Sequence, residues 1–186
     1  MKGMESIMMT DHIEKVLISC EEIKEIVKRL GKQISEDYKG KKLILVGILK
    51  GSVVFMTDLM REINLMCDID FMAVSSYGGG TKTTGRVNIL KDLSAPIEGC
   101  DVLVVEDIVD SGVTLNYILK YLINRNPNSV KLCSLLDKPS GRIVEVNVDY
   151  IGCTIPDEFV VGYGLDYAEK YRNLPYIGVL KPEIYS

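Results

Sequence analysis

The sequence predicts an α/β fold in which helices flank a mainly parallel β-sheet. Short and wholly apolar runs, such as residues 43–49, are typical of strands buried on both faces of a sheet. Segments with apolar residues at helical spacing separate these runs, so strands and helices alternate along the chain. The 186 residues suit one domain, and 47% hydrophobic with 26% charged residues is an ordinary globular composition. We therefore expect a single domain over residues 1–186, with a flexible start at residues 1–9.

The first half of the chain predicts two helices and two strands. Ser19 and Glu22 have the spacing of a capping box, and apolar residues follow at helical spacing, which predicts a long first helix. The run KLILVGIL, residues 42–49, then predicts a buried strand. Ser52 is placed to cap a second helix. A second strand should cover about residues 69–74.

The second half repeats this alternation. The apolar run DVLVV, residues 101–105, predicts a strand that leads into a polar turn and then a helix with an apolar face. The runs SVKLCSLL and VDYIGCTI predict two more buried strands. Polar loops follow Leu49, Val105 and Leu136, at the carboxyl ends of three predicted strands. Ligands bind at that edge of a parallel sheet, so the loops mark the predicted site.

Composition narrows the function class. A net charge of −4 disfavours a broad nucleic-acid surface, and the longest apolar run is far shorter than the roughly 20 residues of a membrane helix. The cysteines are odd in number and form no CxxC pair, which disfavours a zinc site or a disulfide framework. Reduced cysteines suit a cytoplasmic protein. They are Cys20, Cys67, Cys100, Cys133 and Cys153.

The segment VVEDIVDSGVT carries the most specific chemistry. Two adjacent carboxylates, Glu106 and Asp107, can accept hydrogen bonds from a sugar diol. The following turn opens a helix whose free N–H groups suit a phosphate. Gly112 permits close backbone approach, and the hydroxyls of Ser111 and Thr114 add donors. An acidic helix cap would explain any one of these residues, but the whole pattern points to a ribose-phosphate ligand.

This segment resembles the phosphoribosyl pyrophosphate signature of the type I phosphoribosyltransferases, in the form of the hypoxanthine-guanine branch. The resemblance covers nearly the whole chain and implies the type I phosphoribosyltransferase fold. It also implies a small hood subdomain built from about residues 155–186 with the N-terminal region. Four further motifs stand in the family's order: LKGS, SSYG, LLDKP and PDEFVVGYGLDYAEKYR.

The resemblance implies two groups of residues around the sugar. The ribose and 5-phosphate group is Glu106, Asp107, Asp110, Ser111, Gly112, Val113 and Thr114. The pyrophosphate group is Lys50, Gly51, Ser76, Tyr77 and Arg172. The Lys50–Gly51 peptide is often cis in this family, and Ser76 with Tyr77 matches the tip of a closing lid. Ser111 and Ser52 depart from the commonest pattern, but Ser111 keeps its hydroxyl and both stay small.

A third group is implied at the purine. It consists of Ile108, Lys138, Phe159, Val160 and Asp166. Lys138 would donate to a 6-oxygen, which favours a 6-oxo purine over adenine, and Phe159 would stack on the base. Mg²⁺ is the implied cofactor, with Asp166, Glu106 and Asp107 near it.

The implied activity is Mg²⁺-dependent transfer of the 5-phosphoribosyl group from phosphoribosyl pyrophosphate to hypoxanthine and guanine. Asp110 is the candidate general base for purine N7, and it could also cap the following helix. The resemblance further implies a homodimer or homotetramer, with no nucleic-acid or membrane partner. Xanthine or adenine as the base, a nucleic-acid-binding regulator and a generic nucleotide-binding module remain as alternatives. The only histidine, His12, lies outside every motif and receives no role.

Overall fold

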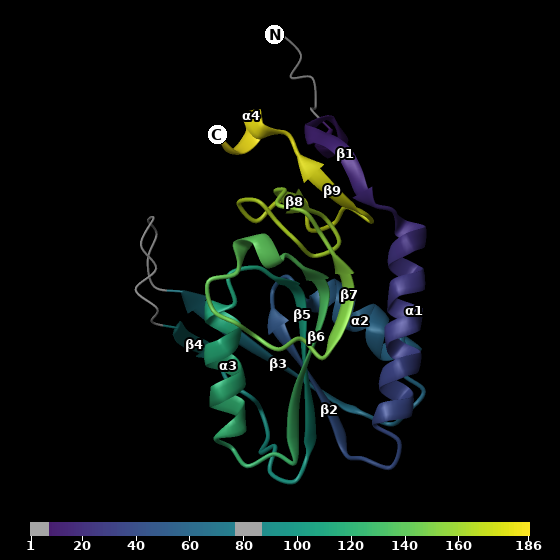
Figure 1. Ribbon diagram of the computed structural model, residues 1–186, viewed down its shortest axis with the longest axis vertical. Coiled ribbons are helices and arrows are strands. Elements are labelled where there is room, and N and C mark those ends of the chain that lie inside the picture. Colours follow the sequence, from purple (N-terminus) through teal and green to yellow (C-terminus); the bar gives the residue numbers. More distant parts are fainter. Residues whose placement is uncertain (1–7, 77–86) are drawn as a thin grey trace, which may run out of the picture.

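The computed structural model describes residues 8–76 and 87–186, which form a large and a small β-sheet (Figure 1). The large sheet is parallel except at β4, which runs antiparallel to β3. This arrangement confirms the predicted α/β class with a mainly parallel sheet. The strand order is β4 (Val87–Lys91), β3 (Asp68–Ser76), β2 (Leu43–Leu49), β5 (Asp101–Val109), β6 (Ser129–Asp137) and β7 (Tyr150–Thr154).

Three helices cover the two faces of the large sheet. Alternate residues of β2, such as Leu43 and Leu45, pack with α1 (Cys20–Asp37) and α2 (Val53–Glu62). Their neighbours Ile44 and Val46 pack with α3 (Val113–Ile123) on the other face. Successive side chains of a strand point to opposite faces, so a wholly apolar strand serves two cores.

The two predicted helix caps had different outcomes. The Ser19 hydroxyl accepts from the Glu22 N–H at 3.3 Å, and the Ser19 N–H donates to the Glu22 carboxylate at 2.8 Å, which confirms the capping box. The prediction that the Ser52 side chain caps α2 is wrong. Ser52 already has helical dihedral angles, and its buried hydroxyl donates back to the Ile48 carbonyl at 2.7 Å.

Strand β5 is longer than the sequence predicts. The expected strand ended at Val105, but β5 continues to Val109 because Ile108 and Val109 pair with Leu136 and Asp137 of β6. The apolar pair after the two acids therefore extends the ladder. Glu106 and Asp107 consequently lie within the strand and not in the loop after it.

The small sheet joins segments from both parts of the chain and was not predicted strand by strand. Its order is β1 (Ile13–Ile18), β9 (Ile177–Leu180) and β8 (Val160–Val161). Two short 3₁₀ helices, η1 (Met9–His12) and η2 (Pro139–Gly141), and the one-turn helix α4 (Pro182–Tyr185) complete the fold. Most of the expected flexible start lies outside the described residues. Among the described helices, none combines the length and the apolar composition needed to cross a bilayer.

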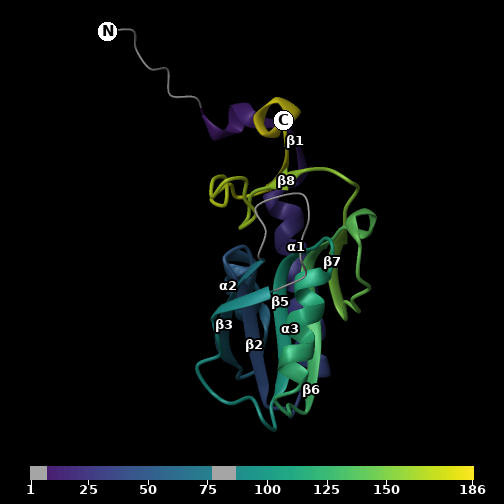
Figure 2. The same cartoon turned by 90° about the vertical axis from the view of Figure 1, so that its left-hand side faces the viewer.

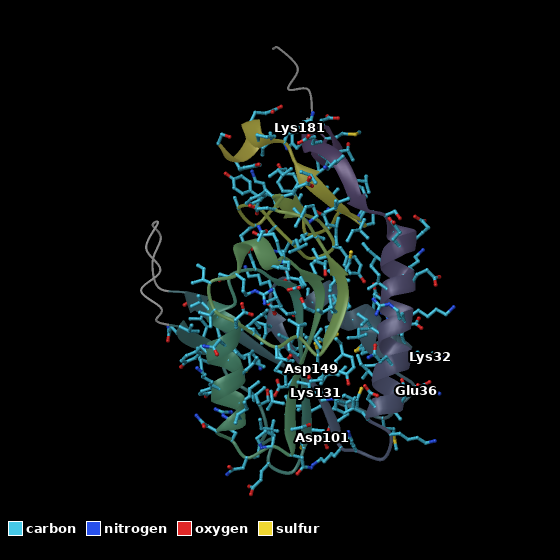
Figure 3. The ribbon with its side chains drawn as sticks, viewed as in Figure 1. Lys32, Glu36, Asp101, Lys131, Asp149 and Lys181 are labelled. Atoms are coloured by element: carbon cyan, nitrogen blue, oxygen red, sulfur yellow. The ribbon has the colours of Figure 1, made fainter. Side chains whose placement is uncertain are left out.

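The small sheet lies beyond the carboxyl edge of the large sheet (Figures 1 and 2). In Figure 3, Asp101 at the start of β5 and Lys181 after β9 mark opposite ends of the molecule. The loops after β2, β5 and β6 therefore open toward the small sheet, as the predicted convergence of the polar loops requires.

Candidate active site

The partly buried carboxylate of Glu106 and the buried carboxylate of Asp107 lie near the carboxyl end of β5. Burial raises the pKa of Glu106 well above its usual value, and Asp107 raises it further. Among the described residues, no donor reaches the shielded Oε2 of Glu106. Burial also raises the pKa of Asp107 to about 6, although the Ile108 N–H at 2.8 Å favours the ionised form. Such a pair is poised to accept donors or a cation that a ligand brings.

The turn after β2 packs directly on Asp107. A Cβ added to Gly51 would lie 1.8 Å from the Asp107 Oδ2 atom, so only glycine fits there. The expected cis peptide at Lys50–Gly51 is wrong by one residue, because the cis bond joins Leu49 and Lys50. Leu49 is the last residue of β2 paired with β3, and the chain turns immediately after it.

The turn between β5 and α3 presents the start of a helix. Gly112 has a φ of 78°, and an added Cβ would lie 2.2 Å from the Val144 carbonyl oxygen. Gly112 is also the N-cap of α3, and no described side chain caps this helix. The first N–H groups of α3, at Val113 and Thr114, therefore have no partner within the helix and can bind an anion.

Asp110 does not cap α3, so that part of its expected role is wrong. Its carboxylate instead lies 3.4 Å from the Lys138 ammonium. The ammonium also lies 3.3 Å from the carboxylate of Asp157. The loops after the neighbouring strands β5 and β6 thus bring together Asp110, the candidate general base, and Lys138, the candidate donor to the purine 6-oxygen.

The cations predicted at pyrophosphate lie together beside the turn after β2. The Lys50 ammonium is 2.9 Å from the Glu169 carboxylate, and Arg172 is 2.8 Å from Asp166 and 3.4 Å from Glu169. Arg172 also donates to the Gly164 carbonyl at 2.8 Å. The hydrogen bond from Lys50 is the main reason that the pKa of Glu169 is lowered.

The residues predicted at the purine come from β5, from the loop after β6 and from the segment around β8. Ile108 of β5 is partly buried against the larger core cluster. Phe159 remains 37% exposed, and the adjacent Val160 pairs with Val179 between β8 and β9. Asp157, two residues before Phe159, reaches Lys138, so this segment lies against the loop after β6.

Sequence reasoning missed two side chains at this edge, Asp157 and Glu169. Both belong to the motif PDEFVVGYGLDYAEKYR, which offered the signal, but nothing in their spacing shows which cation each contacts. Of the predicted lid tip, Ser76 is the last residue of β3, while Tyr77 lies outside the described residues.

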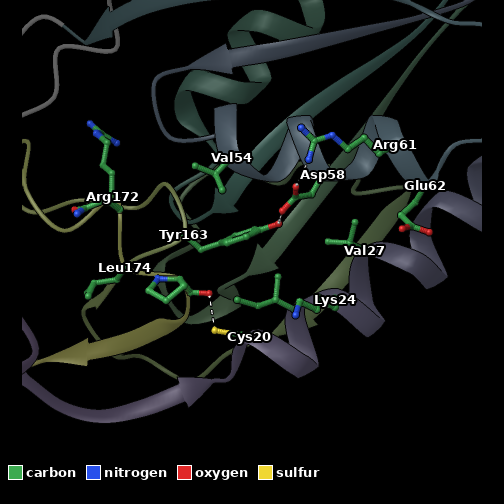
Figure 4. A pocket seen from close by; sticks show the side chains of 13 residues that line it. Cys20, Lys24, Val27, Val54, Asp58, Arg61, Glu62, Tyr163, Arg172 and Leu174 are labelled. Carbon is green, nitrogen blue, oxygen red and sulfur yellow. Dashed lines mark hydrogen bonds and ion pairs between the residues drawn. The ribbon is translucent and has the colours of Figure 1, made fainter.

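A separate cavity of about 570 Å³ lies between α1, α2 and the segment around Tyr163 (Figure 4). The Tyr163 hydroxyl donates to the Asp58 carboxylate at 2.6 Å within it. Arg172 borders this cavity, but the described residues that line it do not include Asp110 or Lys138. The candidate general base and the lysine predicted at the purine therefore lie at the polar edge of the large sheet and not in this cavity.

The similarity of this chain to known proteins agrees with this arrangement of the site. The family described as the phosphoribosyl transferase domain matches residues 19–168, which include the acid pair, the start of α3 and Lys138. The fold and the site at the carboxyl edge therefore define a phosphoribosyltransferase.

Closer relatives narrow the family. A hypoxanthine-guanine phosphoribosyltransferase of Staphylococcus aureus is 54% identical over 178 residues, covering 96% of this chain and 99% of the relative. A crystal structure of a hypoxanthine phosphoribosyltransferase from Staphylococcus aureus matches with a TM-score of 0.94 and 54% identity, over 99% of this chain and 100% of the other. The chain belongs to the hypoxanthine-guanine phosphoribosyltransferase family.

A longer protein contains a similar segment. The bifunctional protein TilS/HprT of Listeria monocytogenes is 56% identical over 178 residues, which cover 96% of this chain. This chain spans only 28% of the length of that relative.

Proposed function

We propose that the chain transfers the 5-phosphoribosyl group from phosphoribosyl pyrophosphate to hypoxanthine and guanine, which yields IMP or GMP and pyrophosphate. One observation carries the proposal. The acid pair of β5, the open start of α3 and the Asp110–Lys138 contact occupy one edge of the sheet. A ribose phosphate and a 6-oxo base need such groups side by side.

The sugar phosphate binds along β5 and α3. The 5-phosphate accepts hydrogen bonds from the first N–H groups of α3 and from the hydroxyls of Ser111 and Thr114. Glu106 and Asp107 accept hydrogen bonds from the ribose hydroxyls, which supply a partner for the shielded Oε2 atom of Glu106.

The base binds beside the loop after β6. The Lys138 ammonium donates to the purine 6-oxygen, and adenine would present an amino donor to it instead. Ile108 and Phe159 flank the purine ring, and the backbone of Val160 contacts the edge of the base. Asp110 accepts the proton from purine N7 as the nucleophilic ring nitrogen bonds to ribose C1.

The pyrophosphate leaves as its bond to C1 breaks. Lys50, the Gly51 backbone and Arg172 hold its charge, and Ser76 with Tyr77 belongs to the segment that would cover it. The developing positive charge on the sugar is stabilised by the placed carboxylates and by exclusion of water.

The donor set fits Mg²⁺ as cofactor. Glu106 and Asp107 are oxygen ligands, and Glu106 has a buried oxygen without a partner among the described residues. No cluster of three metal-ligating side chains occurs in the described part of the chain, so substrate oxygens and water would complete the coordination. Together with Asp166, these residues would hold the ion, which neutralises pyrophosphate charge when bound.

A panel of purines tests the proposal. The full chain is incubated with phosphoribosyl pyrophosphate, Mg²⁺ and either hypoxanthine, guanine, xanthine or adenine, and nucleotide formation is measured. We expect IMP and GMP, with little product from adenine. Product from adenine alone would overturn the base assignment. No product from any base, with retention of a nucleic acid in a gel shift at physiological salt, would favour a regulator.

The domain organisation and oligomeric state that we propose are those implied by the resemblance to the type I phosphoribosyltransferases. We propose one domain over residues 1–186 that assembles as a homodimer or homotetramer, which light scattering would measure. A cytoplasmic location is supported by the five cysteines, which are all free thiols.

A further inference from the structure

Three aromatic rings gather where the small sheet meets α4. The Phe159 and Tyr185 rings are stacked, with centroids 4.6 Å apart and planes 19° from parallel. Tyr167 meets Phe159 edge-on at 5.7 Å and 86°, and it meets Tyr185 at 6.5 Å and 68°. Each pair has a favoured geometry for aromatic rings, so the trio fixes the orientation of the Phe159 ring.

The fold holds Tyr185 in this position. The Phe159 carbonyl accepts from the Leu180 N–H at 2.9 Å, which ties the start of β8 to the end of β9. Lys181 donates through its backbone N–H to the His12 carbonyl at 3.0 Å and through its ammonium to the Asp11 backbone carbonyl at 2.7 Å. This residue, labelled in Figure 3, thereby anchors the chain just before α4.

Helix α4 then turns the chain back onto Phe159. Its first residue is Pro182, whose ring presets a helical φ, and Ser186 N–H donates to the Pro182 carbonyl at 3.0 Å. Ile184 packs against the buried cluster around Val161 and Leu180. The packing of Ile184 fixes the helix, and the next residue, Tyr185, lies against Phe159.

The stack leaves Phe159 available to a ligand. Phe159 stays 37% exposed despite the contact with Tyr185. Asp157, two residues earlier, contacts Lys138, which places the segment between the loop after β6 and α4. Helix α4 lies on the outer side of the small sheet, away from the large sheet (Figures 1 and 2).

We propose that Tyr185 is a positioning residue that supports Phe159 from the side opposite the purine, so that base, Phe159 and Tyr185 form one continuous stack. The inference rests on the proposed function, because Phe159 is taken to contact the base. Without Tyr185, the Phe159 ring samples other orientations before the base binds, and the affinity for the base falls. The sugar and pyrophosphate contacts do not involve this stack.

Steady-state kinetics of Tyr185→Ala test the proposal. We expect the KM for hypoxanthine and guanine to rise about twofold to tenfold, as the loss of one aromatic pair predicts. The KM for phosphoribosyl pyrophosphate and kcat should stay near the wild-type values. Tyr185→Phe keeps the ring and should restore the KM for the base. Tyr185→Leu keeps apolar volume but has no aromatic face. It should raise the KM for the base in the same way, and it serves as the test if Tyr185→Ala folds poorly.

Tyr117→Ala is the matched control. Tyr117 is 39% exposed, compared with 37% for Tyr185, and it stacks on Tyr121 along α3 at a ring distance of 6.3 Å. Its removal should leave the KM for the base unchanged.

The outcomes separate this inference from the proposed function. An active wild type with an unchanged or lower base KM in Tyr185→Ala and Tyr185→Leu would overturn the supporting role, and a lower value would mean that Tyr185 competes with the base. Equal changes in both substrates' KM values would reduce Tyr185 to a general structural residue. A wild type without activity on any purine would refute the proposed function itself.

Discussion

Asp110 contacts Lys138 through its side chain, while Gly112 is the N-cap of α3. Asp110→Asn keeps the size of the side chain but cannot accept the purine proton. General-base catalysis contributes about 10²–10⁴-fold, so kcat should fall within that range. The melting temperature should change little, because no helix cap is lost. Enzyme assays and thermal unfolding of the same preparations measure both quantities.

Asp68→Asn is the control for this substitution. Asp68 is exposed at the start of β3, at the edge of the sheet opposite the site, and its variant should keep full turnover. Full turnover in Asp110→Asn would remove Asp110 from the mechanism.

Glu169 contacts both cations that are proposed to hold pyrophosphate, Lys50 and Arg172. Pyrophosphate must compete with this carboxylate for them. Glu169→Gln should therefore lower the KM for phosphoribosyl pyrophosphate and the inhibition constant for pyrophosphate, each by about twofold to fivefold because exposed ion pairs are weak. The difference should shrink at high salt.

Initial rates at two ionic strengths measure this effect. Glu36→Gln, an exposed change near the far end of α1, should leave both constants unchanged. Weaker binding of phosphoribosyl pyrophosphate in Glu169→Gln would mean that Glu169 organises the two cations and does not compete for them.

At the scale of elements, the end of β5 makes the ligand-free protein sensitive to pH. Burial raises the pKa of Asp107 from 3.8 to about 6, so the folded state binds a proton more tightly than the unfolded chain. The stability that protonation of Asp107 contributes is therefore fully present below the pKa of Asp107 in the unfolded chain. It is lost as the pH rises through the pKa of Asp107 in the folded protein. This rise in the pKa of Asp107, from 3.8 to about 6, corresponds to about 3 kcal/mol.

We expect the melting temperature of the ligand-free protein to fall between about pH 4 and pH 7 from this contribution. Asp107→Asn cannot ionise and should flatten the decline, whereas the exposed control Asp68→Asn should not. Thermal unfolding across this range in the absence of Mg²⁺ and substrates gives the comparison. An equally steep decline in Asp107→Asn would contradict the assignment of this titration to Asp107.

At the scale of the whole molecule, one hydrogen bond joins the segment after β8 to α2. The Tyr163 hydroxyl donates to Asp58 at 2.6 Å, while Asp58 also lies 3.5 Å from Arg61. Tyr163→Phe removes this hydrogen bond but leaves Asp58 partly solvated and paired with Arg61. The free energy of unfolding should therefore fall by about 1 kcal/mol. For a chain of this size the melting temperature should fall by about 2–4 °C.

Differential scanning calorimetry measures this change. Tyr117→Phe, at an exposed position on α3, is the matched control and should have the wild-type melting temperature. An unchanged melting temperature for Tyr163→Phe would mean that the contact between Tyr163 and Asp58 does not stabilise the packing of the segment after β8 on α2.

Apolar periodicity predicted the main helices and the strands of the large sheet apart from β4, because buried strands and amphipathic helices need particular residues at regular spacing. It failed where pairing with another strand decided the outcome. Val109 belongs to β5 only because β6 lies beside it, and β8 is a two-residue strand held by β9. Ser52 has the composition of a cap, but its hydroxyl bonds to the preceding turn.

The sequence by itself determined the fold class, the family and the segments that carry the chemistry, because these depend on residue types in local order. Only the tertiary structure decided which charges meet. Lys138 lies between Asp110 and Asp157, and Glu169 joins Lys50 to Arg172. These partners are distant in sequence for the most part, and their contacts arise where neighbouring strands end at one edge and the small sheet closes over it. Side-chain direction and packing set such contacts, and neither can be read from spacing along the chain.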